Sequence, residues 1–248
     1  SIRDYDAVWS HDGTQIAYIT DDGTGQALHI EDQSGIEDVR SVPLGERFYS
    51  LVAWGNDGKT IVYVTNPLTL NALDVATGET WEIATSARRN GNFDTAMSPK
   101  GRWIAYTTRG ETNNASLSLY DLETRQSYPV SRGFADIGSP VFSKDGKTLF
   151  FTASTNAGSF YAGLDMTTQD RPYRAGLYAA VLEADGKSPL APSLADEEAP
   201  KKEKGKAADG AAKAEEGDKP KKGVTVDAAG LEQQIVSLPM AEAFYTSL

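Results

Sequence analysis

The stretch VWSHDGTQIAY, residues 8–18, recurs three more times in the first 151 residues. The other copies are AWGNDGKTIVY at 53–63, AMSPKGRWIAY at 96–106 and VFSKDGKTLFF at 141–151. Their turn glycines stand 45, 43 and 45 residues apart: Gly13, Gly58, Gly101 and Gly146. A fixed period of about 40–45 residues is the length of one four-stranded propeller blade. The repeat therefore predicts an all-β propeller fold and assigns most of the visible pattern to the scaffold.

Each copy contains the signals of a β-hairpin. A short strand ends before a turn made of Asp-Gly in three copies and of Lys100-Gly101 in the remaining one. Asp-Gly favours a two-residue hairpin, because such a loop needs positive φ angles. The next strand alternates, as in Ile61-Val62-Tyr63, which is typical of a half-buried strand. We expect a third strand and an outer fourth strand to complete each blade.

The third strand recurs as ALHIEDQSG (27–35), LNALDVATGE (70–79) and LSLYDLETRQ (117–126). Glu31, Asp74 and Asp121 are interpreted as equivalent positions in these segments. Recurrence of an acidic residue at one repeat position indicates a structural role, in which the carboxylate accepts backbone hydrogen bonds at a strand end.

The periodicity divides the chain into about four blades, expected at 1–50, 51–93, 94–137 and 138–192. After Phe151 a loop of about 25 residues, rich in aromatic side chains, is long enough to favour a packed, functional segment. Residues 193–223 hold eight lysines and eight acids with no aromatic residue, a composition typical of a disordered linker. Residues 224–248 are expected to supply closing strands that lead to a further domain. Four blades are few for a closed ring, so we expect them to be part of a larger one.

Composition excludes several functions. The formal net charge of −11 argues against nucleic-acid binding, which needs a basic surface. The chain has no cysteine, so it contains no disulfide and no thiol nucleophile. No apolar run approaches the roughly 20 residues that span a bilayer, and SIRDYDAVWS (1–10) does not resemble a signal peptide. We therefore expect no membrane association. Because the repeat is already present in the first residues, we also expect the parent sequence to continue beyond both ends. The cytoplasm and a bacterial periplasm both suit a cysteine-free chain.

The sequence offers little reactive chemistry. His11 stands in a turn position and His29 in a strand, and no Gly-x-Ser-x-Gly motif or Ser-His-Asp set can be assembled around them. Asp21-Asp22-Gly23 lacks the other ligands of a calcium loop and is interpreted as a hairpin turn. We expect no catalytic residue, cofactor or metal in this segment.

The candidate binding residues are three arginines, Arg88, Arg89 and Arg132. They lie in the segments that link an outer strand to the inner strand of the next blade, where loops can line the mouth of a propeller channel. An arginine there can hold a peptide carboxylate through two parallel hydrogen bonds. Ordinary solvated surface charge is the simpler interpretation of the same residues.

The repeat resembles those of the TolB, prolyl-oligopeptidase and tricorn families. Residues 149–192, with the stretch LDMTTQDRP at 164–172 and SPLAP at 188–192, together with 224–239, are similar to the end of the second propeller of tricorn-type proteases. That resemblance covers essentially the whole chain. It implies a large oligomeric serine peptidase that trims oligopeptides, in which PDZ-like and catalytic domains follow the propeller. The nucleophile, its histidine and the oxyanion donors belong to that catalytic core, so no catalytic residue carries over to these 248 residues.

Three functions stay open at this point. The first is a non-catalytic scaffold and peptide passage of a tricorn-like serine peptidase, with oligopeptides and the other domains of that peptidase as partners. The second is a TolB-like propeller that binds a protein partner and has no enzymatic role. The third is the propeller of a prolyl-oligopeptidase-type enzyme, which needs an α/β-hydrolase domain beside it.

Overall fold

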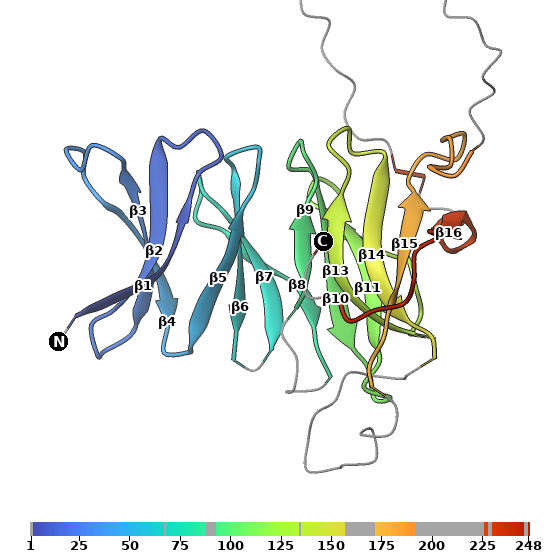
Figure 1. The fold of residues 1–248 in the computed structure, drawn as a ribbon. Helices are drawn as coiled ribbons and strands as arrows, with labels where there is room; N and C mark the ends of the chain where they lie inside the picture. The colour runs from blue at the N-terminus through green and yellow to red at the C-terminus, as the bar shows by residue number, and fades with distance from the viewer. Residues whose placement is uncertain are drawn as a thin grey trace, which may run out of the picture.

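The computed structural model describes residues 2–66, 68–87, 93–133, 135–156, 172–191, 226–227, 230–245 and 248. These residues form four four-stranded antiparallel sheets, in each of which the strands lie in sequence order. The sheets stand side by side along an arc (Figure 1). Each sheet is one blade, so the predicted all-β propeller architecture is confirmed.

The strand bounds follow the repeat. The first blade contains β1 (Arg3–Trp9), β2 (Gln15–Asp21), β3 (Gln26–Asp32) and β4 (Arg40–Gly45). The second contains β5 (Tyr49–Trp54), β6 (Thr60–Thr65), β7 (Thr69–Asp74) and β8 (Thr80–Thr85). The third contains β9 (Thr95–Met97), β10 (Trp103–Arg109), β11 (Ala115–Asp121) and β12 (Gln126–Pro129). The fourth contains β13 (Asp136–Phe142), β14 (Thr148–Ser154), β15 (Gly176–Val181) and β16 (Ile235–Ser237).

The fourth blade takes its outer strand from much further along the chain. The short 3-10 helix η2 (Leu231–Gln234) leads into β16, which pairs antiparallel with β15. Ile235–Ser237, within the expected closing segment 224–248, is thus an integral strand of this blade. The linker predicted at 193–223 lies outside the described residues, as does 157–171, the central part of the long blade-four loop.

The hairpin turns are longer than the two-residue loops expected from Asp-Gly. In the first turn Gly13 alone has positive φ, at 71°, and its N–H donates to Ser10 O. The Asp12 carboxylate accepts the N–H of Thr14, and Ser10 Oγ accepts the N–H of Gln15. The two-residue prediction is therefore wrong, because the serine and aspartate side chains stabilise a wider turn.

In the first blade the recurring acidic residue lies one position later than predicted. Asp32 pairs with Gln15 across β2 and β3, just as Asp74 pairs with Thr60 and Asp121 with Trp103 in later blades. Asp32, rather than Glu31, is therefore the equivalent residue. The structural role holds at these positions, since Asp32 accepts the N–H of Ser34 and Asp74 that of Thr77.

The core lies between neighbouring blades. One cluster of buried apolar side chains joins the first and second blades, a second joins the second and third, and a third joins the third and fourth. Leu231 of η2 belongs to the last cluster, which anchors the returning segment against the third and fourth blades. Burial of apolar area between repeats is the main stabilising term in such a stack.

The first strand of each sheet lies on the inner edge of the arc. β1 contacts β5, and β9 contacts β13, across the blade boundaries. The inner strands β1, β5 and β13 are irregular, with shifts of register between Tyr5 and Val8, Leu51 and Ala53, and Gly138 and Val141. Such bulges bend a strand and turn its side chains.

Candidate functional site

The inner edge of the arc forms a polar wall. Exposed residues of β1 and β5 along it include Asp4, Asp6 and Ser50. Asp94 joins the third and fourth blades here, because its Oδ2 accepts the N–H of Ser139 at 3.0 Å. Ser139 has a φ of 49°, an uncommon conformation for a residue other than glycine. The described part of the wall therefore presents carboxylates and hydroxyls, which bind polar groups, and one of these carboxylates, Asp4, accepts the hydroxyl of Thr20 at 2.8 Å.

An ion pair between a half-buried arginine and a buried aspartate connects the third and fourth blades. Arg109 Nη1 donates to Asp136 Oδ1 at 2.9 Å, and the N–H of Ala115 donates to the same oxygen. Burial raises the pKa of Tyr173 to about 12, an effect that the carboxylates of Asp136 and Asp94 increase and that Arg109 opposes. The ring of Tyr173 packs edge-on against Phe244. At neutral pH this tyrosine therefore keeps its proton.

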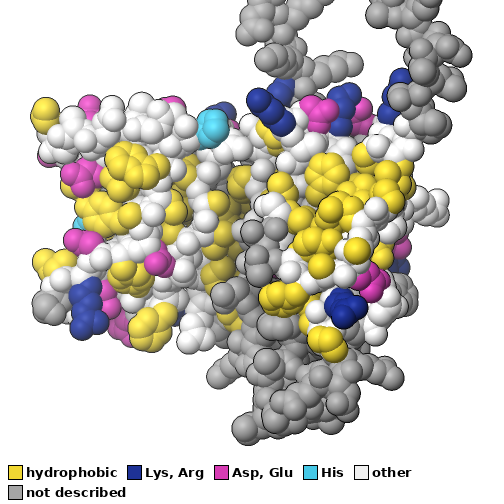
Figure 2. Space-filling model, viewed as in Figure 1, with side chains coloured by type: hydrophobic (Ala, Val, Ile, Leu, Met, Phe, Trp, Pro, Cys, Tyr) yellow, Lys and Arg dark blue, Asp and Glu magenta, His cyan; other side chains and the backbone are white. Residues whose placement is uncertain are grey.

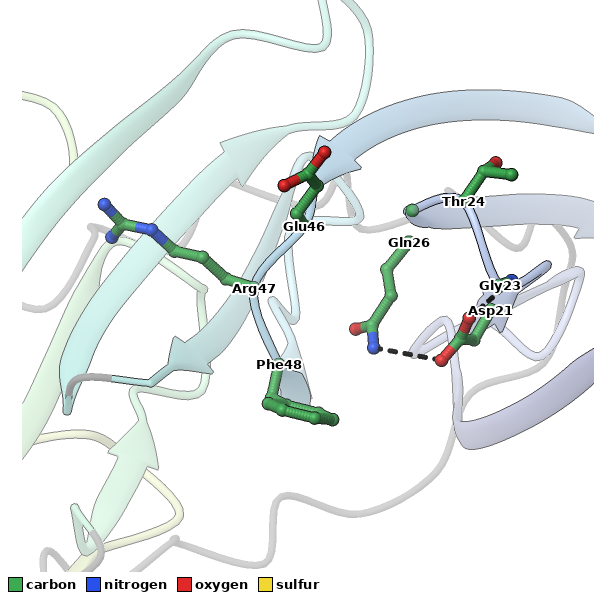
Figure 3. Close-up of a pocket in the computed structure, with 8 residues that line it drawn as sticks. Asp21, Gly23, Thr24, Gln26, Glu46, Arg47 and Phe48 are labelled. Atoms are coloured by element: carbon green, nitrogen blue, oxygen red, sulfur yellow. Dashed lines mark hydrogen bonds between the residues drawn. The ribbon is translucent and has the colours of Figure 1, made fainter.

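A hollow of about 330 Å³ opens between the β2–β3 turn and the β4–β5 loop. Figure 3 shows Asp21, Gln26 and Phe48 around it, with Arg47 pointing away from them. Gln26 is buried and fixed, because its Oε1 accepts the hydroxyl of Tyr5 at 2.7 Å and the N–H of Tyr49. Phe48 is 71% exposed, which makes it an unusual aromatic side chain on this loop face.

The arginines predicted as binding residues are only partly placed. Arg132 Nε donates to Glu232 Oε1 at 2.6 Å, and both side chains are well exposed. Glu232 belongs to η2, directly before the outermost strand β16, so this ion pair ties the loop between the third and fourth blades to the outer edge. Arg88 and Arg89 lie outside the described residues.

The two histidines lie in different surroundings, and His29 Nδ1 is 3.4 Å from Thr20 Oγ1, which donates to Asp4. His11 is exposed in the first turn, and His29 of β3 packs its ring edge-on against Tyr18 with centroids 5.4 Å apart. Within the described parts of the chain, no group of three or more His, Cys, Asp or Glu residues is placed to hold a metal ion. No helix among those residues has the length and apolar character of a membrane span.

Four consecutive four-stranded blades packed through apolar interfaces define a β-propeller repeat protein. Residues 1–248 match the family model of the tricorn protease second beta propeller domain, and the chain belongs to this family.

Two solved structures with TM-scores above 0.5 show the same fold. The crystal structure of the tricorn protease superposes with a TM-score of 0.64 at 18% identity, covering 95% of this chain and 21% of that one. A prolyl endopeptidase structure gives a TM-score of 0.51 at 13% identity, covering 76% of this chain and 29% of the other. A putative TolB from Agrobacterium tumefaciens gives 0.48 at 17% identity, covering 71% and 60%. Comparison with curated protein sequences finds no significant match. The chain spans about a fifth of the tricorn protease chain that it matches.

Sequence reasoning missed the β4–β5 loop. The loop reads ERF at 46–48 and contains both Arg47 and the exposed Phe48. It interrupts the blade repeat with two charges and an aromatic side chain, and that combination on an inter-blade loop was the available signal.

Proposed function

We propose that this chain is a non-catalytic propeller segment of a tricorn-like serine peptidase that trims oligopeptides. In this proposal it acts as a scaffold and as a peptide filter or passage, and the active site belongs to downstream domains. The observation that carries the proposal is the match of residues 1–248 to the tricorn second propeller. The polar inner wall supports it, since this wall can contact peptide groups without reacting with them.

The partners in this proposal are oligopeptides, the PDZ-like and catalytic domains of the parent peptidase, and further copies of the parent in a homo-oligomer. Arg88 and Arg89 contribute peptide-carboxylate contacts at the passage mouth. Arg132 contributes through the part of its guanidinium that the ion pair with Glu232 leaves free, because its side chain is 68% exposed. Replacing all three with alanine weakens peptide binding if these contacts are made, and unchanged binding contradicts them.

The test of the passage uses the absence of cysteine from this chain. Ser50→Cys in the parent peptidase places one thiol on the exposed inner wall, where a polyethylene glycol maleimide can be attached. We expect the attached polymer to slow hydrolysis of long oligopeptides while leaving a short fluorogenic substrate unaffected.

The matched control is Glu37→Cys, on the exposed β3–β4 loop away from the inner wall. Polymer at this position is expected to leave both substrates unaffected. Equal rates for long peptides with both labelled variants would show that peptides do not pass along the inner wall.

A further inference from the structure

A second hollow, a groove of about 280 Å³, lies between the first and second blades. One side is formed by Pro43 and Leu44 of β4, and the other by polar residues of the second blade. Its volume is near the lower end of the roughly 300–1,000 Å³ range of ligand pockets. It therefore has room for a small polar group or for roughly the last one or two residues of a peptide.

The second-blade wall consists of residues that face each other directly across the sheet. Tyr63 pairs with Asn71, and Asn71 pairs with Glu82, so the three side chains form a row across β6, β7 and β8. Thr65 and Thr69 form the next row and are hydrogen-bonded to each other. The wall thus combines hydroxyl, carboxamide and carboxylate groups.

Asn71 is held in a fixed orientation with an acceptor to spare. Its Nδ2 donates to Thr69 O and to Thr69 Oγ1, both at 3.0 Å. Among the described residues none donates to Asn71 Oδ1, which therefore stays available to accept an N–H.

Arg47 supplies the positive charge of this groove. It extends from the β4–β5 loop between the two hollows, and it lines both the hollow of Figure 3 and this groove, the latter together with Tyr63 and Asn71. Its guanidinium makes no hydrogen bond or ion pair with any described residue. A free guanidinium presents a planar fork of donors that fits a carboxylate.

The same row in the third blade lacks this chemistry. There the pairs are Tyr106 with Ser118 and Ser118 with Pro129, which provide neither a carboxamide nor a carboxylate. Leu68 and Ala84 pack into the apolar interface between the second and third blades. The polar groove between the first two blades is therefore a departure from the repeat and not a consequence of it.

We propose that this groove binds the C-terminal end of an oligopeptide. Arg47 holds the terminal carboxylate, Asn71 Oδ1 accepts a peptide N–H, and the Glu82 carboxylate accepts a further N–H. Peptide handling by the parent protein is taken from the proposed function, and this inference adds the end of the peptide that is recognised and the residues that recognise it.

The test measures binding of a fluorescent tetrapeptide to the full-length parent protein by anisotropy, with hydrolysis blocked by a serine-directed inactivator. The peptide is used with a free C-terminal carboxylate and as its C-terminal amide. We expect Arg47→Ala to weaken binding of the free acid about 5- to 10-fold and to leave the amide unchanged, because a charge-assisted pair is lost. The affinity of Arg47→Lys for the free acid is expected to lie between those of wild type and Arg47→Ala, since lysine keeps the positive charge but lacks the paired N–H donors of the guanidinium.

Arg174→Ala is the matched control, because Arg174 is an exposed arginine just before β15 of the fourth blade, outside the groove and away from β1 and β5 of the inner wall. Equal affinity of Arg47→Ala and Arg174→Ala for the free acid would overturn the inference, as would an equal loss for acid and amide. Peptide cleavage by the parent protein is measured separately. If the parent protein cleaves peptides normally but Arg47→Ala does not change binding, the proposed peptide site in the groove is wrong and the proposed function stands. If binding depends on Arg47 but the parent protein cleaves no peptide, the proposed peptidase function is wrong and the binding site stands.

Discussion

Tyr18, Tyr63 and Tyr106 occupy the same position of the repeat in three successive blades, but their surroundings differ. Tyr63 and Tyr106 are each 5% exposed between two blades, whereas Tyr18, on the outer side of the first blade, is only half-buried. Ile61 and Ile16 differ in the same way, because Ile61 is fully buried and Ile16 is not. The repeat thus encodes a face that is completed only when another blade packs on it.

The other end of the arc carries a similar face. Figure 2 shows hydrophobic side chains gathered over the fourth blade, where β13, β14 and β15 lie in Figure 1. Phe150 stands where Val62 and Ala105 stand in the inner blades, and it is half-buried while those two are fully buried. Both end faces fit the expectation of a larger ring.

The largest effect is expected from the same substitution at a central and a terminal interface. Ile61→Ala opens a cavity between the first and second blades and should cost about 2–5 kcal/mol of unfolding free energy. Ile16→Ala removes a partly solvated side chain and should cost about 1 kcal/mol or less, because less area leaves water. Denaturant titration of both variants measures the difference. Equal losses would contradict the view that the outer side of the first blade lacks a neighbour.

The next largest effect is expected at an aspartate of the third blade whose counterpart in the second blade has different hydrogen-bond donors. Asp121 is 2% exposed and receives two hydrogen bonds from Arg102, at 3.0 and 2.7 Å. Asp74, at the same repeat position, instead accepts the N–H and hydroxyl of Thr77. Arg102→Ala should cost about 1.5–3 kcal/mol, because it leaves a buried carboxylate without its main donor.

The pH dependence of that loss provides a control. Burial alone would raise the pKa of Asp121, but the hydrogen bonds from Arg102 and from the N–H of Glu123 outweigh it and hold the pKa below its ordinary value of 3.8. The stabilisation is therefore complete above the ordinary value and is lost as the pH falls through the lower, folded value. Denaturant titrations of wild type and Arg102→Ala should converge in acid. A difference that stays constant into acid would contradict the role given to Asp121.

The blades were predictable from sequence because turn residues and alternating strands recur at a fixed period. The fourth blade shows where this stops. The outer strand Ile235–Ser237 reaches its partner β15 only after the charged segment, and no local pattern encodes a pairing over that distance. The turn type was also mistaken, because the serine and aspartate bonds that widen the turn depend on three-dimensional placement.

The candidate site was less predictable. Arg132 was predicted as a binding residue because it lies in a segment that links two blades. In the structure it forms an ion pair with Glu232, a residue 100 positions away in the chain, and a local sequence pattern does not encode that pairing. The groove beside Arg47 depends on the register that aligns Asn71 with Glu82, and register cannot be deduced from a loop sequence.

A smaller effect compares the turns of the fourth and second blades. Ser143 Oγ accepts the N–H of Thr148 at 3.0 Å, whereas the second blade has Gly55 at this position and closes its turn without a serine hydroxyl, through the Gly55 N–H to Thr60 O, Gly58 N–H to Gly55 O and Lys59 N–H to Asp57 Oδ1 bonds. Ser143→Ala should therefore cost only about 0.5–1.5 kcal/mol. Amide hydrogen exchange should show faster exchange at Thr148. Unchanged protection there would indicate that the serine contributes nothing to the turn.

The smallest effect at neutral pH is expected from Tyr173→Phe, beside the fourth blade. The folded pKa of Tyr173 is about 12 against an ordinary value of 10.0, and its first cause is burial. Below the ordinary value both states keep the proton, so the substitution should not change the pH dependence of stability. Between the two values the unfolded chain releases the proton while the folded chain retains it, so wild-type stability should decline as the pH rises. Tyr173→Phe should remove that part of the decline, measured by thermal unfolding across the alkaline range. Identical alkaline profiles for the two proteins would show that Tyr173 ionises as readily in the folded chain as in the unfolded one.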